Sequence, residues 1–290
     1  MNIESNIESF AEFIAELCAY SLVVPERLLR WTIIANPSAG GFTIPRRWKE
    51  HRDALKAAVR KVCSSNPKRA DSGPSQTTLN AAENLPKLSA LGLVATRGPG
   101  HAGRVTADLL REAAAEAVVE AAPETPAGTP LPFHLVICAG GDGTGLEVLS
   151  RLYEAPPELR ERFAVLRLPM GTGNDGADSR KLEEALELLI QPVELTGIPA
   201  LRLTTSVEGK GPFLAFNILS VGLDAFVTHM TNKTKGNLPG DSYKLWVDIA
   251  SLLYDRIYHV GPMEVRAFDE AGRTLTSFRE PLLLLAVGIS

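Results

Sequence analysis

A short stretch in the middle of the chain combines bare backbone with a carboxylate and a hydroxyl: Gly140, Gly141, Asp142, Gly143 and Thr144. Glycines permit tight turns and expose backbone N–H groups, so a strand that leads through them into a helix gathers donors for a phosphate. A negatively charged carboxylate at such a site would repel the anion, so its presence there suggests a chemical role. Asp142 would hold a divalent cation against the phosphates or accept the proton of an attacking hydroxyl. The plainer alternative is a tight turn with a solvated Asp, and the motif alone does not decide.

The sequence on either side supplies the elements that would position this turn. The apolar run at 133–138 has the length and β-branched content of a buried strand, and a helical pattern begins near Leu146. Glu147 lies in that helix, close enough to the turn to orient its hydroxyls. We therefore predict Asp142 and Glu147 as catalytic residues, with Asp142 also the metal ligand.

Three further apolar runs, at 31–35, 92–96 and 163–169, also end in polar turns with glycine and are followed by helical patterns. The candidate binding residues of these turns are Asn36, Pro37, Ser38, Thr96, Gly100, His101, Gly171, Thr172, Asn174 and Asp175. Strands that alternate with helices predict a parallel α/β sheet with a ligand at its carboxyl edge. Simple turn chemistry is the alternative for Asn36 and Pro37, and His101 is either a phosphate contact or a polar neighbour of a helix start.

The chain before the first strand predicts a helix over 7–20, because apolar positions recur at helical spacing opposite a row of glutamates. Packing against the main body or a partner is favoured over contact with a membrane surface, since anionic lipid repels a Glu-rich face. Further helices are expected at 45–62, at 102–121 and after Ser179, which is placed to cap the last. Residues 64–88 are typical of a surface insertion, and the Pro-rich residues 122–132 of a stiff loop.

The pattern of expected secondary structure changes near residues 191–197. Beyond them come β-like runs at 200–206, 213–219, 262–268 and 281–287, interrupted by one helical pattern at about 242–254. We predict a helical extension (1–30), a parallel-sheet α/β nucleotide-binding domain (31–192) and a β-rich, sandwich-like second domain (193–290), with the active site in the cleft between the last two.

Composition narrows the function. The formal net charge of −4 over 290 residues offers no basic footprint for nucleic acid. Three widely spaced cysteines suggest neither a disulfide framework nor a zinc site, and the acidic N-terminus does not resemble a secretory signal. The longest uncharged apolar run, at 281–290, is short for a membrane span. We expect a cytoplasmic protein that is at most peripheral to a membrane.

Taken together and in order, the turns resemble the diacylglycerol kinase catalytic domain, a family that also takes in sphingosine kinases, ceramide kinases and bacterial lipid kinases. The motifs that carry the resemblance are Asn36-Pro37, Thr96 with residues 99–102, residues 140–144 with Glu147-Val148, residues 169–175, Phe216-Asn217, residues 222–225 and residues 240–243. The resemblance runs from about Thr32 to the last residue, and four co-linear motifs make it specific.

The resemblance implies an α/β domain packed on an antiparallel β-sandwich, with ATP and Mg2+ between them and a lipid alcohol as acceptor. Asp142 would be the base or the metal-linked carboxylate, and Asp224 would face the polar head of the acceptor. The residues expected to line ATP include Asn36, Thr96, Gly140, Gly141, Gly143, Thr144, Gly171 and Thr172. The Walker sequence GxxxxGK[ST] is absent from the chain, so amides and magnesium would neutralise the phosphates.

Two departures from the family pattern stand out. Gly176, Ala177 and Asp178 follow the Asn-Asp pair where the family usually has an aromatic residue and then Ala-Arg. The family also normally continues past the position of Ser290, which implies a fragment or a trimmed variant.

NAD kinase shares the first glycine motif, but the GTGND sequence at 171–175 favours the lipid branch. A nucleotide- or lipid-binding module without turnover is the other alternative, and a homodimer stays open.

Overall fold

The computed structural model describes residues 2–23, 28–65, 92–120, 131–234, 242–258 and 260–289. The chain divides into two compact units, Met1–Ile198 and Pro199–Ser290. Most of the predicted insertion (64–88), most of the predicted stiff loop (122–132) and the first two residues of the 240–243 motif lie outside the described residues. Among the described helices, none is long and apolar enough to cross a membrane.

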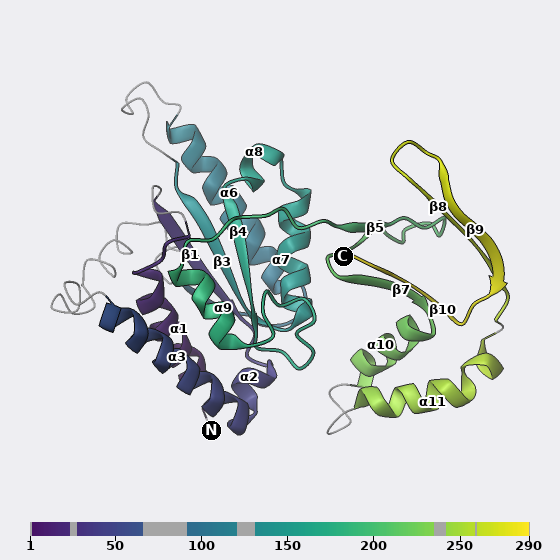
Figure 1. Ribbon diagram of the computed structural model, residues 1–290, viewed down its shortest axis with the longest axis horizontal. Helices are drawn as coiled ribbons and strands as arrows, with labels where there is room; N and C mark the ends of the chain where they lie inside the picture. The colour runs from purple at the N-terminus through teal and green to yellow at the C-terminus, as the bar shows by residue number, and fades with distance from the viewer. Residues whose placement is uncertain are drawn as a thin grey trace. The chain divides into compact units, whose positions relative to one another are not determined.

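A four-stranded parallel sheet in the order β2-β1-β3-β4 forms the centre of the first unit (Figure 1). The strands are β1 (Leu29–Ala35), β2 (Leu93–Ala95), β3 (Phe133–Gly140) and β4 (Phe163–Pro169). Every residue of β3 is buried, which explains its unbroken apolar run, because helices cover both faces of such a sheet. The predicted parallel α/β architecture is confirmed.

Alternate residues of the central strands point to opposite faces of the sheet. The described helices of the first unit are α1 (Ile3–Cys18), α2 (Gly40–Thr43), α3 (Pro45–Ser65), α6 (His101–Glu120), α7 (Asp142–Glu154), α8 (Pro157–Arg160) and α9 (Leu182–Ile190). Ile33, Leu135 and Ile137 pack with α1, α3 and α9, whereas Ile34 and Val136 pack with α6 and α7. Two apolar layers therefore hold the sheet and fix where its strands end.

Helix α1 is part of the core of the first unit. Phe10, Ile14 and Leu17 are fully buried, and the ring of Phe10 meets Phe42 edge-on at 5.4 Å between centroids. The prediction that this helix packs against the main body is confirmed. Its apolar face lies in the protein core and is not free for a membrane surface.

The start of α9 differs from the prediction. The helix begins at Leu182 after Lys181, and the hydroxyl of Ser179 accepts the Lys181 N–H at 3.3 Å and donates to Glu184 at 2.6 Å. Ser179 is thus not the capping residue, because the helix starts two residues too late and its N-cap position is Lys181.

The second unit is rich in antiparallel strands, as predicted. β5 (Leu201–Leu203) pairs with β6 (Phe213–Ala215), β7 (Ile218–Gly222) with β10 (Leu284–Gly288), and β8 (Pro262–Phe268) with β9 (Thr274–Pro281). The run at 213–219 therefore contributes to two strands, and the run at 281–287 spans the end of β9 and most of β10.

Two helices, α10 (Leu223–Thr234) and α11 (Ser242–Ile257), occur in the described part of the second unit, where the sequence predicted one. Helix α10 carries β-branched Val227 and Thr228 and two more threonines, which weaken the helical signal. Its Phe226 packs against Tyr254 and Tyr258, with ring centroids 5.6 and 5.4 Å apart. Packing against α11 therefore supports a helix that the local sequence favours only weakly.

Candidate functional site

The order of the strands marks one place on the sheet. The chain leaves β1 for β2 on one side and then returns to β3 and continues to β4 on the other, so the order reverses between β1 and β3. In open α/β sheets, ligands bind at such a reversal, outside the carboxyl ends of the strands. Here the N–H of Asn36 donates to the Ala139 carbonyl at 2.9 Å, and the N–H of Thr96 donates to the Ala35 carbonyl at 2.7 Å. The turns after three strands thus meet at one edge.

Helix α7 starts inside the glycine turn, at Asp142, and not near Leu146 as the sequence predicts. The glycines at 143 and 145 hide the helical pattern, since glycine has low helix propensity. The first bonds of the helix run from the N–H groups of Thr144 and Gly145 to the Gly141 carbonyl, at 3.0 and 3.3 Å. The N–H groups of Asp142 and Gly143 precede these bonds, so they are the donors that the helix leaves for a ligand.

The turns after β3 and β4 touch backbone to backbone. A Cβ built on Gly171 would lie 2.6 Å from the Cα of Gly141, closer than real side chains approach. The Asp142 carboxylate also points at the second turn, where its Oδ1 accepts the Gly176 N–H at 2.8 Å. Asp142 therefore belongs to the turn after β3 and is bonded by the turn after β4. The residue that bonds it is Gly176, one of the departures from the family pattern.

Two exposed carboxylates flank Gly173 in this second turn. A Cβ at Gly173 would lie 3.1 Å from Oδ2 of Asp142 and 3.8 Å from Oδ2 of Asp175. Among the described residues, no group of three His, Cys, Asp or Glu side chains could hold a metal on its own. Two carboxylates without a complete cage suit Mg2+, which is usually bound by one or two carboxylates together with substrate phosphates.

Asn174 shapes the turn after β4. Its φ of 63° is in the left-handed region, its Oδ1 accepts the Gly171 N–H at 2.7 Å, and its Nδ2 donates to the Pro169 and Gly171 carbonyls at 3.2 Å. At the far end of the turn, Asp178 accepts from the Arg167 guanidinium at 2.7 and 3.0 Å. Asn174 thus supports the turn, and Thr172 remains exposed on it.

The turn after β1 follows ordinary turn chemistry. Oδ1 of Asn36 accepts the Ser38 N–H at 3.0 Å, which is the local bond that Asn makes in turns. Asn36 and Pro37 are half-buried and Ser38 is exposed. The N–H of Gly41 donates to the Met170 carbonyl at 2.8 Å, which joins this turn to the end of β4.

Thr144 is buried under its own turn. A Cβ on Gly140 would lie 2.4 Å from Oγ1 of Thr144, so the threonine side chain fills the space that the glycine leaves. Gly140 is required at this position for that reason. Thr144 supports the turn from below, and its predicted place beside a nucleotide stays a prediction.

In the turn before α6, Nδ1 of His101 accepts the Arg97 N–H at 3.0 Å. The bond agrees with the alternative that His101 is a polar neighbour of the helix start, and a contact of His101 with phosphate stays a prediction. The sequence predicts that Glu147 orients hydroxyls of its own loop, but its carboxylate accepts the Gly100 N–H at 2.6 Å and the Gly103 N–H at 3.3 Å. Glu147 therefore serves the neighbouring turn.

Two residues of α3, Arg47 and His51, reach the same edge and were missed in the sequence. Nη1 of Arg47 donates to the Gly171 carbonyl at 3.1 Å, and the His51 ring would lie 2.9 Å from a Cβ on Gly41. Burial lowers the pKa of His51, and the charge of Arg47 lowers it further, against Glu183 and Glu50. The signal was present, because Pro45 sets the helix start and puts positions 47 and 51 one turn apart on one face.

Asp224, predicted to face the acceptor, lies in the first turn of α10 in the second unit. Its Oδ2 accepts from the Ser220 hydroxyl at 2.6 Å, which fixes its side chain at the end of β7. Its role toward a substrate stays a prediction.

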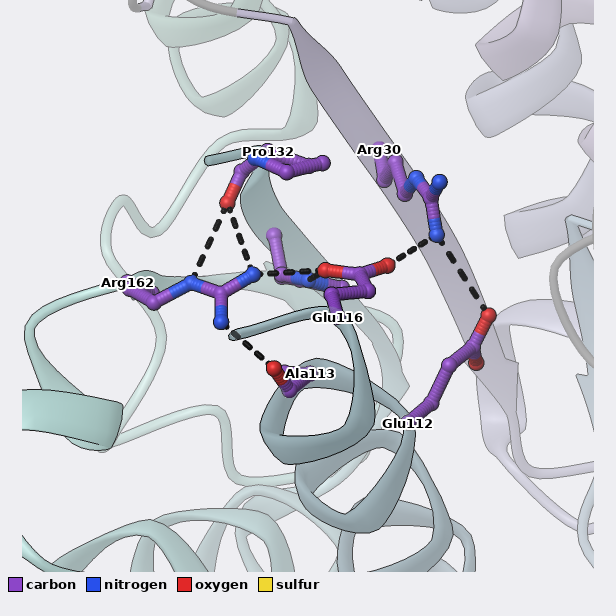
Figure 2. Close-up of polar contacts among 7 residues, drawn as sticks. Arg30, Glu112, Ala113, Glu116, Pro132 and Arg162 are labelled. Atoms are coloured by element: carbon purple, nitrogen blue, oxygen red, sulfur yellow. Dashed lines mark hydrogen bonds and ion pairs between the residues drawn. The ribbon is translucent and has the colours of Figure 1, made fainter. Parts of the chain in front are cut away.

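A second polar cluster lies at the opposite, amino edge of the sheet, and no motif pointed to it (Figure 2). This amino-edge cluster consists of Arg30, Glu112, Glu116, His134 and Arg162. Oε2 of Glu116 lies 2.5 Å from Nη2 of Arg162 and 3.1 Å from Nε2 of His134, and its other oxygen pairs with Arg30. Burial raises the pKa of Glu116, but His134, Arg30 and Arg162 outweigh it, so the pKa lies below its ordinary value. The cluster anchors the end of α6 to the sheet.

The fold and the site define an α/β protein in which glycine turns surround an aspartate at a helix N-terminus. The family model for the diacylglycerol kinase catalytic domain matches residues 30–199, more than half of the chain, and the chain belongs to this family. Over 114 residues the chain is 36% identical to the probable lipid kinase YegS-like of Enterobacter sp. (strain 638). These residues make up 39% of this chain and 36% of that protein. The match thus spans about a third of the relative's length, and the resemblance predicted from the motifs is confirmed.

Proposed function

We propose that this chain acts as an ATP-dependent lipid kinase, which transfers the γ-phosphate of Mg-ATP to a hydroxyl of a diacylglycerol- or sphingoid-type lipid. Membership of the diacylglycerol kinase catalytic domain family supports the reaction class, and the name of the Enterobacter relative supports a lipid acceptor. The observation that carries the proposal is the position of Asp142. Its exposed carboxylate lies at the N-terminus of α7, where the strand order reverses, and faces the turn after β4.

The nucleotide would bind through backbone more than through side chains. The N–H groups of Asp142 and Gly143 and the positive end of the α7 dipole suit the phosphates, and the turns at 36–38, 96–101 and 171–175 would line the nucleotide. Asp142 and Asp175 would hold Mg2+, since both flank Gly173. The ion, when bound, neutralises charge on the phosphates.

The transfer itself needs positioning and one proton acceptor. The lipid hydroxyl oxygen forms a bond to the γ-phosphorus as the bond from that phosphorus to the β–γ bridging oxygen breaks. ADP leaves with the electron pair of the broken bond, and the product is a lipid phosphate monoester. Oδ1 of Asp142 is engaged by the Gly176 N–H, so Oδ2 is the atom left for the reaction, either as the proton acceptor or as the Mg2+ ligand. Asp224 would bind the polar head of the acceptor, and contact with the bilayer would be peripheral.

The test is transfer of labelled γ-phosphate from Mg-ATP into a total lipid extract, with NAD as a second acceptor. Asp142→Asn keeps the shape of the side chain and removes the proton acceptor, so we expect the rate to fall at least about 100-fold. Asp53→Asn, an exposed carboxylate on α3, is the matched control and should retain the wild-type rate. Chromatography of the labelled product identifies the lipid class.

Other outcomes would overturn the proposal in distinct ways. Label in NAD and none in lipid would make the chain an NAD kinase. Binding of Mg-ATP by calorimetry, without transfer to lipid or to NAD, would support a binding module. Undiminished transfer in Asp142→Asn would show that this carboxylate is not the proton acceptor.

A further inference from the structure

Helix α6 begins with two glycines at the positions where helices usually cap themselves. In the usual reciprocal cap, the side chain of the residue before the helix and that of the third helical residue each accept one free N–H. In α6 these residues are Gly100 and Gly103, which have no side chains. The local chain therefore cannot satisfy the N–H groups that the first turn leaves free.

Glu147 of α7 supplies this cap from outside the helix. One carboxylate oxygen accepts the Gly100 N–H at 2.6 Å, and the other accepts the Gly103 N–H at 3.3 Å. The close packing of the two helices makes this reach possible. A Cβ on Gly103 would lie 3.6 Å from the Glu147 carbonyl and 3.5 Å from Cγ of Arg151, so α6 and α7 meet at Gly103.

This geometry argues against two other roles for the site. A carboxylate whose two oxygens each accept a backbone N–H is poorly placed to take the proton of a substrate, which needs direct contact. The N-terminus of α6 is also unsuited to a nucleotide phosphate. The N–H groups of Gly100, His101 and Gly103 are already bonded, and the negative charge of Glu147 would repel a second anion there.

We propose that Glu147 is a positioning residue, which caps α6 and fixes the turn at 96–101 relative to Asp142, one helical turn away on α7. This inference rests on the proposed function, because the turn at 96–101 is one of the candidate nucleotide-binding turns. Loss of the cap leaves the α7 N-terminus in place but frees the neighbouring turn. Nucleotide binding therefore weakens, while the rate of transfer at saturating ATP is retained.

The experiment compares Glu147→Ala and Glu147→Gln with wild type and with Glu154→Ala, a control on the exposed end of the same helix. We expect Glu147→Ala to raise the KM for ATP and the calorimetric Kd for Mg-ATP about tenfold, with kcat within about threefold of wild type. Glu147→Gln still offers one acceptor oxygen, so it should restore most of the affinity. Amide hydrogen exchange in residues 97–104 should accelerate in the alanine variant and not in the control.

The outcomes separate this inference from the proposed function. A fall in kcat of about 100-fold in both Glu147 variants, with unchanged KM, would make Glu147 a catalytic residue and overturn the positioning role. Unchanged exchange in residues 97–104 would overturn the cap itself, whether or not the chain binds ATP. A lower melting temperature with unchanged KM and Kd would show that Glu147 only stabilises the fold, and this would also overturn the positioning role. Wild-type protein that binds no Mg-ATP would sink the proposed function, and the exchange measurement would still test the cap.

Discussion

Replacement of Gly171 by alanine tests whether the two glycine turns meet as closely as the structure shows. The new methyl group would lie 2.6 Å from the Cα of Gly141 and 2.9 Å from Oδ1 of Asn174. Ordinary carbon–carbon contacts need about 3.5–4.0 Å. The turns after β3 and β4 would have to separate by about 1 Å, and Gly171 is buried, so no exposed side chain can give way.

The expected cost of this overpacking is about 2 kcal/mol. For a unit of the size of Met1–Ile198, that corresponds to a fall in Tm of about 4–8 °C. Differential scanning calorimetry of the full chain measures it. Gly197→Ala is the matched control, because a Cβ there meets nothing within 4 Å and the site is exposed, and its Tm should stay within about 1 °C of wild type.

The same variant should bind Mg-ATP more weakly, since separation of the turns moves Gly176 away from Asp142. Equal Tm values for Gly171→Ala, Gly197→Ala and wild type would refute the close approach of the two turns. A lower Tm with unchanged Mg-ATP affinity would refute the link between this contact and the nucleotide site.

Two further predictions concern single side chains that hold the first unit together. Asn174→Ala should destabilise more than Asn174→Gly, by roughly 1 kcal/mol in chemical denaturation, because both lose the bonds within the turn but only alanine is strained at a φ of 63°; equal losses would show that backbone strain contributes nothing. Glu116→Gln should cost about 2 kcal/mol at neutral pH, since Arg30 and Arg162 lose a half-buried carboxylate partner. The folded-state pKa of Glu116 is depressed, so its contribution is complete above the unfolded pKa and is lost as pH falls through the folded one. The Tm difference between wild type and Glu116→Gln should therefore shrink below about pH 4, and a constant difference down to pH 3 would contradict this.

Sequence reasoning recovered the sheet because burial on both faces leaves an unambiguous signal. The predicted bounds of β4 match the structure, and β3 extends the predicted run by two residues, Ala139 and Gly140, into the glycine turn. The order of the motifs also gave the family correctly. The sequence also placed Asp142 and Asn174 correctly in the turns after β3 and β4, and their roles toward a ligand stay predictions.

The sequence said little about partners that lie far apart along the chain. Periodicity assigns a residue to a face of a helix but does not say which backbone atoms it meets, so Glu147 was expected to serve its own loop and not Gly100 and Gly103. The amino-edge cluster was missed for the same reason. His134 and Arg162 lie in or beside apolar strands and look like isolated polar residues until the sheet places them next to Glu116.

Glu147, which sequence reasoning misplaced, and Glu116 and Arg162, which it missed, all hold helix α6 in place. This helix packs along β3 on the side opposite α1. Glu147 bonds the first turn of α6 to α7, and Arg162 bonds its last turns to the sheet through Glu116 and the Ala113 carbonyl. A helix held at both ends cannot slide along its axis without breaking charge-assisted bonds at one of them. The turn before α6 therefore has a fixed position along the helix axis relative to Asp142, although its own glycines do not make it rigid. In the proposed function this turn is one of the nucleotide-binding turns, so both anchors of α6 would help to position it.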